Sequence, residues 1–233
     1  MDKQQARDLI KKTFEQPFDK TRFMTFVQEL LNHVEYAPFN YHGSYIPEAY
    51  RQYISSLERI GKFNDGENRI DILIIKLQKE TSLANARTMQ RNFVAGYLQG
   101  KYGSSSKKEA VLVAYVAPGE ADWRFSLVKM DYKFEQAPTG EMKAEEEFTL
   151  ARRWSFLVGE NEKSHTAQSR LVNILTNDEH NPTLAELEEA FNIEPVTKEF
   201  FEKYHELFLR VKEALDDIIN SNEDVKIDFE TKG

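Results

Sequence analysis

The chain contains no cysteine among its 233 residues. This absence excludes disulfides, thiolate metal sites and a cysteine nucleophile. There is also no phosphate loop, no GxGxxG motif and no GxSxG motif, and none of the five histidines has the spacing of a zinc site such as H-E-x-x-H. An ATPase, a dinucleotide-dependent enzyme or a hydrolase with a nucleophile elbow therefore has no support in the sequence.

Long apolar runs are missing as well. No segment approaches the roughly 20 apolar residues that span a bilayer, and the polar start Met1–Gln5 leads into no apolar segment of a signal peptide. We therefore expect a cytoplasmic protein with no membrane partner. With 40% hydrophobic and 30% charged residues, the composition is that of a globular chain that can bury a sizeable core.

The net charge of −8 is unevenly distributed. Residues 166–233 carry 16 acidic and 7 basic residues, net −9, whereas residues 1–165 carry 23 acidic and 24 basic residues, net +1. A near-neutral body can still present a basic face to DNA. The acidic part is more typical of a solvated surface or a docking element.

Apolar segments concentrate between Arg69 and Phe134 and predict a small α/β sheet. Arg69–Leu77 is apolar on both faces, as in a strand buried on both sides. Residues 83–98 show helical spacing, and strands are predicted at 110–116, 123–134 and 152–158. The expected fold is α/β, with a mixed sheet of about four strands.

The remaining segments predict helices on either side of this sheet. Amphipathic patterns and capping residues predict helices at 3–14, 20–34, 47–60, 164–175, 183–191 and 197–220. Many aromatic residues occur in Tyr36–Tyr45, and we expect this segment to be a loop that packs onto the body.

Asp71 is the most unusual polar residue, because it interrupts the apolar strand. A buried aspartate needs a partner or a metal ion. One interpretation is a pocket that binds a divalent cation, with Asp71 as an oxygen ligand. The other is that Asp71 lies at the start of the strand beside Arg69, either paired or exposed.

Asp131 and Lys133 have the Asp-x-Lys spacing that places a carboxylate and an ammonium group on one side of a strand. In metal-dependent nucleases such a pair holds Mg²⁺ and orients the attacking water. The motif is short, and Glu141-Met-Lys143 has the same spacing. We regard Asp71, Asp131 and Lys133 as candidate catalytic residues, with Asp71 and Asp131 as metal ligands.

A third group of polar residues could bind DNA phosphates or could simply be solvated. The candidates on the predicted helix are Arg87, Gln90 and Arg91, and those in the loop after it are Lys107 and Lys108.

Five segments resemble the N-terminal region of large bacterial single-chain restriction-modification proteins of type IIG. The segments are Phe14–Phe23 (FEQPFDKTRF), Arg69–Leu77 (RIDILIIKL), Ala86–Phe93 (ARTMQRNF), Asp122–Met130 (DWRFSLVKM) and Ser155–Gln168 (SFLVGENEKSHTAQ). The resemblance as a whole covers most of the 233 residues. The resemblance implies an endonuclease domain of the PD-(D/E)xK type, followed by a helical connector. It also implies an adenine-N6 methyltransferase and a target-recognition domain elsewhere in the same polypeptide.

On this resemblance the chain divides into N-terminal helices (1–62), a nuclease-like core (63–176), an acidic helical connector (177–220) and a tail (221–233). Asp71 matches the strand aspartate of the nuclease motif, but no Glu-x-Lys strand follows at the usual distance. The methyltransferase motif Asn-Pro-Pro-Tyr is absent, so S-adenosylmethionine would bind only outside this chain.

The expected function is therefore a Mg²⁺-dependent endonuclease module that hydrolyses phosphodiester bonds of double-stranded DNA. The alternative is a non-catalytic DNA-binding or scaffold domain of the same kind of protein. Such a domain would use Tyr36–Tyr45 and the C-terminal helices as docking surfaces.

Overall fold

A computed structural model describes residues 1–79, 87–103, 107–130, 135–136, 142–143 and 152–221. The chain divides into two compact units, Met1–Asn192 and Ile193–Gly233. The first unit therefore contains both the predicted N-terminal segment and the predicted core.

The first unit is built on a mixed six-stranded sheet, which confirms the α/β class and adds two strands to the four predicted. The strand order is β1 (Glu35–His42), β2 (Ile54–Asn64), β3 (Arg69–Leu77), β4 (Ala110–Val116), β5 (Asp122–Lys129) and β8 (Arg152–Gly159). Only β3 and β4 run parallel; every other neighbouring pair in this sheet is antiparallel. A separate two-stranded ribbon pairs β6 (Glu135–Gln136) with β7 (Met142–Lys143).

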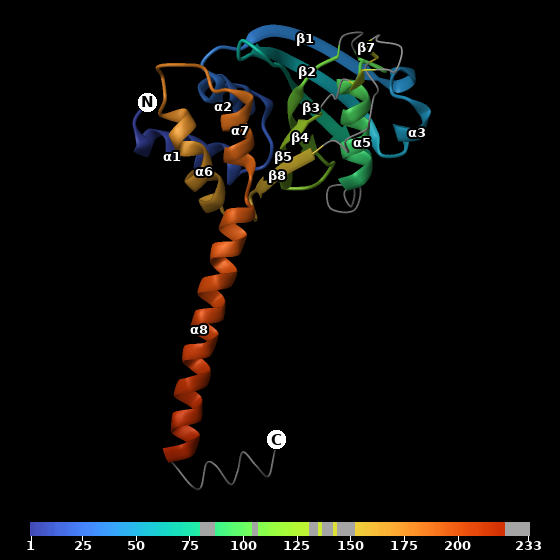
Figure 1. Cartoon of the computed structure of the whole chain (residues 1–233). Helices are drawn as coiled ribbons and strands as arrows, with labels where there is room; N and C mark the ends of the chain where they lie inside the picture. Colours follow the sequence, from blue (N-terminus) through green and yellow to red (C-terminus); the bar gives the residue numbers. More distant parts are fainter. Residues whose placement is uncertain (80–86, 104–106, 131–134, 137–141, 144–151, 222–233) are drawn as a thin grey trace. The chain divides into compact units, whose positions relative to one another are not determined.

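Helix α5 (Arg87–Leu98) connects the two parallel strands and covers one face of the sheet (Figure 1). A parallel pair requires such a crossover, whereas antiparallel neighbours can be joined by short turns. The core on this face contains Leu73, Ile75, Val111, Val113 and Phe93.

The opposite face is covered by helices from both ends of the first unit (Figure 1). They are α1 (Lys3–Phe14), α2 (Lys20–Leu31), α6 (His165–Leu175) and α7 (Leu184–Phe191). Phe14, Phe23, Phe26 and Phe191 meet Phe125 of β5, with ring centroids 5.0 to 5.8 Å apart. Capping boxes begin α1 at Asp2 and α7 at Thr183, the second as predicted.

Two predictions for residues 36–60 are wrong. Only Glu48–Arg51 of the predicted helix 47–60 is helical (α3), and Ile54–Asn64 is a strand. Residues Ile54, Leu57 and Ile60 are buried at a spacing of three, which imitates a helix. Register shifts between Ile54 and Ser56 and between Arg59 and Gly61 explain this spacing, because each bulge inserts a residue into the strand's alternation.

The aromatic segment is not a packed loop either. Its residues form the edge strand β1 and a short 3-10 helix, Gly43–Tyr45. Tyr36 is 74% exposed and Tyr45 is 68% exposed, so much of the aromatic surface faces outward.

The second unit contains α8 (Glu194–Ser221), which includes the predicted helix 197–220. The predicted tail lies outside the described residues, apart from its first residue, Ser221. No helix in the described part of the chain is long and apolar enough to cross a membrane.

Candidate functional site

Asp71 lies on β3 in the middle of the sheet, paired in register with Lys62 of β2 and Val111 of β4. Its side chain is on the face covered by α5, and the residue is only 2% exposed. A carboxylate at such a position must be compensated by hydrogen bonds or opposite charges.

Three side chains provide this compensation, and all of them contact the same carboxylate oxygen, Oδ2. The Tyr97 hydroxyl donates a hydrogen bond of 2.6 Å. The Arg59 guanidinium and the Lys108 ammonium each lie 3.6 Å from Oδ2. Asp71 is therefore paired, but with Arg59 and Lys108 rather than with the neighbouring Arg69.

The backbone around Lys108 explains how this residue reaches the interior. Lys108 lies two residues before the start of β4, and its backbone N–H donates to the Leu98 carbonyl at the end of α5. Its Nζ lies 4.6 Å from the centroid of the Tyr97 ring, a cation–π distance. The Lys108 side chain is 3% exposed. Lys108 is thus part of the buried ionic cluster and is not an exposed side chain of the loop that follows α5.

Arg59 and Tyr97 are held by different elements. Arg59 Nε donates to the Ala37 carbonyl on the edge strand at 2.8 Å, which fixes the guanidinium next to Asp71. Tyr97 is in the last turn of α5, beside Gly103. Gly103 has a φ of +80°, and a side chain at this position would collide with the Tyr97 ring.

Burial changes the acid–base properties of this cluster. Desolvation lowers the pKa of the Lys108 ammonium, although the negative charge of Asp71 opposes the shift. Desolvation and the Asp71 charge both raise the pKa of the Tyr97 phenol, which therefore remains a hydrogen-bond donor at neutral pH. Lys108 consequently gives up its proton more readily than a surface lysine.

Asp71 and Lys108 line a pocket of about 440 Å³ that also includes His33, Glu35, Lys62, Phe63, Asn64 and Arg69. Arg69 forms a fork with Glu109, donating at 3.0 and 3.3 Å to its two carboxylate oxygens. Burial favours a higher pKa for Glu109, but the hydrogen bonds from Arg69 outweigh it and lower that pKa. The pocket therefore combines a buried carboxylate with several cationic side chains.

Among the described residues, the other predicted site residues Arg87, Gln90, Arg91 and Lys107 do not line this pocket. Gln90 is fully buried in α5, so it is not placed to reach a phosphate at the surface. Arg87 and Lys107 are exposed and Arg91 is half-buried. Asp131 and Lys133 lie outside the described residues.

Sequence reasoning missed Arg59 and Tyr97 as members of the site. The predicted helix 47–60 includes Arg59 and gives it no relation to Asp71. Tyr97 lies within the helical spacing of residues 83–98, and spacing does not reveal where a hydroxyl group points. Only the requirement that a buried Asp71 must have partners indicated that such residues exist.

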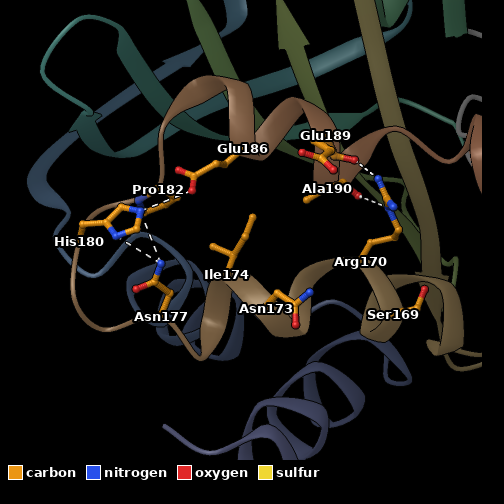
Figure 2. Close-up of a pocket in the computed structure, with 10 residues that line it drawn as sticks. All are labelled: Ser169, Arg170, Asn173, Ile174, Asn177, His180, Pro182, Glu186, Glu189 and Ala190. Atoms are coloured by element: carbon orange, nitrogen blue, oxygen red, sulfur yellow. Dashed lines mark hydrogen bonds and ion pairs between the residues drawn. The ribbon is translucent and has the colours of Figure 1, made fainter.

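A second pocket, of about 300 Å³, lies between α6 and α7 (Figure 2). At one end, His180 Nε2 lies 3.4 Å from Glu186 and the ring nitrogens also contact Asn177. At the other end, Arg170 donates to the carbonyls of Glu189 and Ala190 (Figure 2). These polar groups tie α6 to α7, so we assign the pocket a structural role.

Within the described ranges, no group of three or more histidine, aspartate or glutamate residues has the arrangement of a metal site. No family model, curated protein or solved structure matches the chain. The geometry around Asp71 is therefore the main basis for a functional proposal.

Proposed function

We propose that the chain is a Mg²⁺-dependent DNA endonuclease module of a restriction-modification protein, with the pocket around Asp71 as its active site. The observation that carries this proposal is the buried Asp71 carboxylate, 3.6 Å from the Lys108 ammonium, in a pocket large enough for a phosphate group. A carboxylate next to a lysine is the pairing that metal-dependent phosphodiester hydrolysis uses.

Each residue has a distinct role in this proposal. Asp71 supplies an oxygen ligand to the metal, and Lys108 orients the attacking water or accepts its proton, which its lowered pKa favours. Lys62 and Arg69 attract the DNA phosphate at the rim of the pocket. The mixed sheet would be a PD-(D/E)xK-like core with Asp71 on its central pair of strands.

The donor chemistry of the pocket suits Mg²⁺ in part. Mg²⁺ prefers carboxylate oxygens and is often held by one or two carboxylates together with water and substrate phosphates. Asp71 supplies one such group, and Asp131 remains the predicted second ligand. When bound, the metal would lower the pKa of a water molecule and stabilise the negative charge that develops on the phosphate.

A second candidate function is supported by the same cluster. Because Arg59 and Lys108 already compensate Asp71, the carboxylate can be purely structural, and the chain would then be a non-catalytic DNA-binding or scaffold domain. The exposed aromatic residues of β1, including Tyr36, would be available for docking in that case.

The test is cleavage of supercoiled plasmid DNA by the whole chain with Mg²⁺ or Mn²⁺ at low salt, where backbone contacts are strongest. The variants Asp71→Asn and Lys108→Met remove the proposed catalytic groups. Asp65→Asn is the matched control, since Asp65 accepts a hydrogen bond from the Leu184 backbone and does not line the pocket. Thermal unfolding establishes that each variant is folded, and fluorescence anisotropy measures binding of double-stranded DNA.

We expect metal-dependent nicking by the parent chain and by Asp65→Asn, and none by folded Asp71→Asn. DNA binding without cleavage in either metal would instead identify the non-catalytic DNA-binding module. A chain that neither binds nor cleaves DNA would contradict the endonuclease proposal and leave a scaffold role.

A further inference from the structure

Helix α8 of the second unit carries a stripe of large apolar residues that its own unit leaves exposed. Eight large apolar residues of α8 are between 49% and 67% exposed: Phe200, Phe201, Tyr204, Leu207, Phe208, Val211, Leu215 and Ile218. They recur at spacings of one, three and four residues and form a single stripe on the helix. A stripe of this size marks an interaction surface.

The stripe follows a seven-residue repeat, in which position a is occupied by Tyr204, Val211 and Ile218. Position d is occupied by Phe200, Leu207 and Ala214, and position e by Phe201, Phe208 and Leu215. One flank of the stripe, position e, is therefore apolar. The other flank, position g, is charged and contains Lys203, Arg210 and Asp217.

We propose that α8 pairs with α8 of a second copy of this chain, in antiparallel orientation. In a parallel pair, the charged g flank of each helix would lie against the apolar e flank of the other. In an antiparallel pair, e faces e and g faces g, so apolar residues meet apolar residues and charges meet charges. The distribution of residue types on α8 thus favours the antiparallel arrangement.

In one antiparallel register, the sizes of the facing side chains and the signs of the facing charges are both complementary. It places Tyr204 level with Ala214 of the second copy and Leu207 level with Val211 of the second copy, so that the largest of these side chains meets the smallest. Lys203 then faces Asp217 of the second copy, and the twofold symmetry generates this ion pair twice. The two helices could also be shifted by seven residues in the direction that keeps most of their length in contact. That register would bring Lys203 against Arg210 of the second copy, and the two positive charges would repel.

Charges near the twofold axis are compensated within each helix. Arg210 would lie close to Arg210 of the second copy, but its guanidinium is 2.5 Å from Glu206 of its own helix. Lys203 is likewise 2.6 Å from Glu199. Lys203 and Glu199 are 72% and 64% exposed, so the Lys203 ammonium can rearrange towards Asp217 of the second copy at little cost.

Sedimentation equilibrium of the full chain over a range of concentrations tests the proposal. We expect a monomer–dimer equilibrium that Leu207→Asp abolishes. Asp217→Lys should weaken the dimer about tenfold, because two attractive pairs become repulsive. The double variant Lys203→Asp, Asp217→Lys should restore the original affinity, since it exchanges the charges. Asp216→Lys is the matched control, because it makes the same charge change on the outward side of the helix.

The absence of native cysteine allows a second test of orientation. Phe208 lies opposite Phe208 of the second copy in the proposed register, whereas Phe201 lies opposite Leu215 of the second copy. Under mild oxidation, Phe208→Cys should form a disulfide-linked dimer and Phe201→Cys should not. Any one of four results would overturn the proposal. The chain could be a monomer at every concentration, or its dimer could be insensitive to Leu207→Asp. The charge exchange could fail to restore the affinity, or both cysteine variants could cross-link equally. A monomer would assign the stripe to a different partner.

Discussion

The two faces of the sheet bury different kinds of side chain. On the face covered by α1, α2, α6 and α7, Phe125 is surrounded by four aromatic rings and the neighbouring Trp123 contacts three. On the face covered by α5, apolar packing gives way at one end of β3 to Asp71 and its three polar partners.

This difference separates the part of the sheet that provides stability from the part that provides chemistry. Burial of aromatic surface stabilises a fold without further requirements. A buried ionic cluster is a poor source of net stability, because the desolvation of its charges offsets their attraction. A protein that retains such a cluster beside a pocket departs from the simplest packing, and departures of this kind are expected at functional sites.

The largest effect should come from the aromatic face. Phe125→Ala removes a fully buried ring and should lower the free energy of unfolding by about 4 kcal/mol. Urea denaturation followed by circular dichroism measures this change. A loss below about 1 kcal/mol, far under the usual cost of a Phe→Ala change in a core, would show that this face is not the main source of stability.

Asp71→Ala should have the next largest effect. It leaves the buried Lys108 and the largely buried Arg59 side chains without their shared carboxylate, and we expect the free energy of unfolding to fall by about 3 kcal/mol. The same denaturation experiment tests this value. Asp122→Ala, which removes a carboxylate that bonds Asn161 at the surface, is the control and should cost less.

Lys108→Met should have a smaller effect on stability than Asp71→Ala. The methionine side chain fills most of the space of the lysine stem, and Asp71 keeps Arg59 and Tyr97 as partners. We expect the free energy of unfolding to fall by about 2 kcal/mol, which is less than the usual cost of leaving a buried charge without any partner. A loss equal to that of Asp71→Ala would show that Lys108 is the essential partner and Arg59 is not.

Asp65→Asn tests a carboxylate that ties the β2–β3 turn to α7. Burial raises the pKa of Asp65, but hydrogen bonds from the backbone of Asn68 and Leu184 outweigh it and hold the pKa below 3.8. Asp65 therefore stabilises the folded state fully when the pH lies above its ordinary pKa. This stabilisation is lost as the pH falls through the lower pKa that Asp65 has in the folded state. For Asp65→Asn we expect the free energy of unfolding to fall by about 1 kcal/mol at neutral pH. At acid pH the variant should lose less additional stability than the parent chain, because it has no carboxylate to protonate at this position. Thermal unfolding at several pH values measures both, and an unchanged acid response would contradict the assignment.

Arg87→Gln should change stability least, because Arg87 is exposed at the start of α5. The change in unfolding free energy should stay within about 0.5 kcal/mol. If α5 contributes to the DNA surface, this variant should bind double-stranded DNA more weakly and with a shallower salt dependence. Fluorescence anisotropy at several salt concentrations measures this, and unchanged binding would exclude Arg87 from the DNA surface.

The sequence indicated the central part of the fold because local patterns and burial agree there. The apolar run Arg69–Leu77 is a strand, and the helical spacing after it corresponds to α5. Residues 54–64 misled the prediction because two bulges in β2 gave its buried residues a helical spacing. Bulges are fixed by pairing with neighbouring strands, so this information is not present in the segment alone.

By itself, the sequence determined that the protein is an α/β chain, that Asp71 interrupts an apolar strand, and that one stripe of the last helix is apolar. These properties depend only on residue type and on spacing along the chain, so they can be derived without knowing which distant residues come into contact. Only the tertiary structure decided that Asp71 meets Arg59, Tyr97 and Lys108, residues 12, 26 and 37 positions away. Such contacts depend on how strands pair and on where α5 ends, because side chains distant in sequence come together only when the whole sheet has formed.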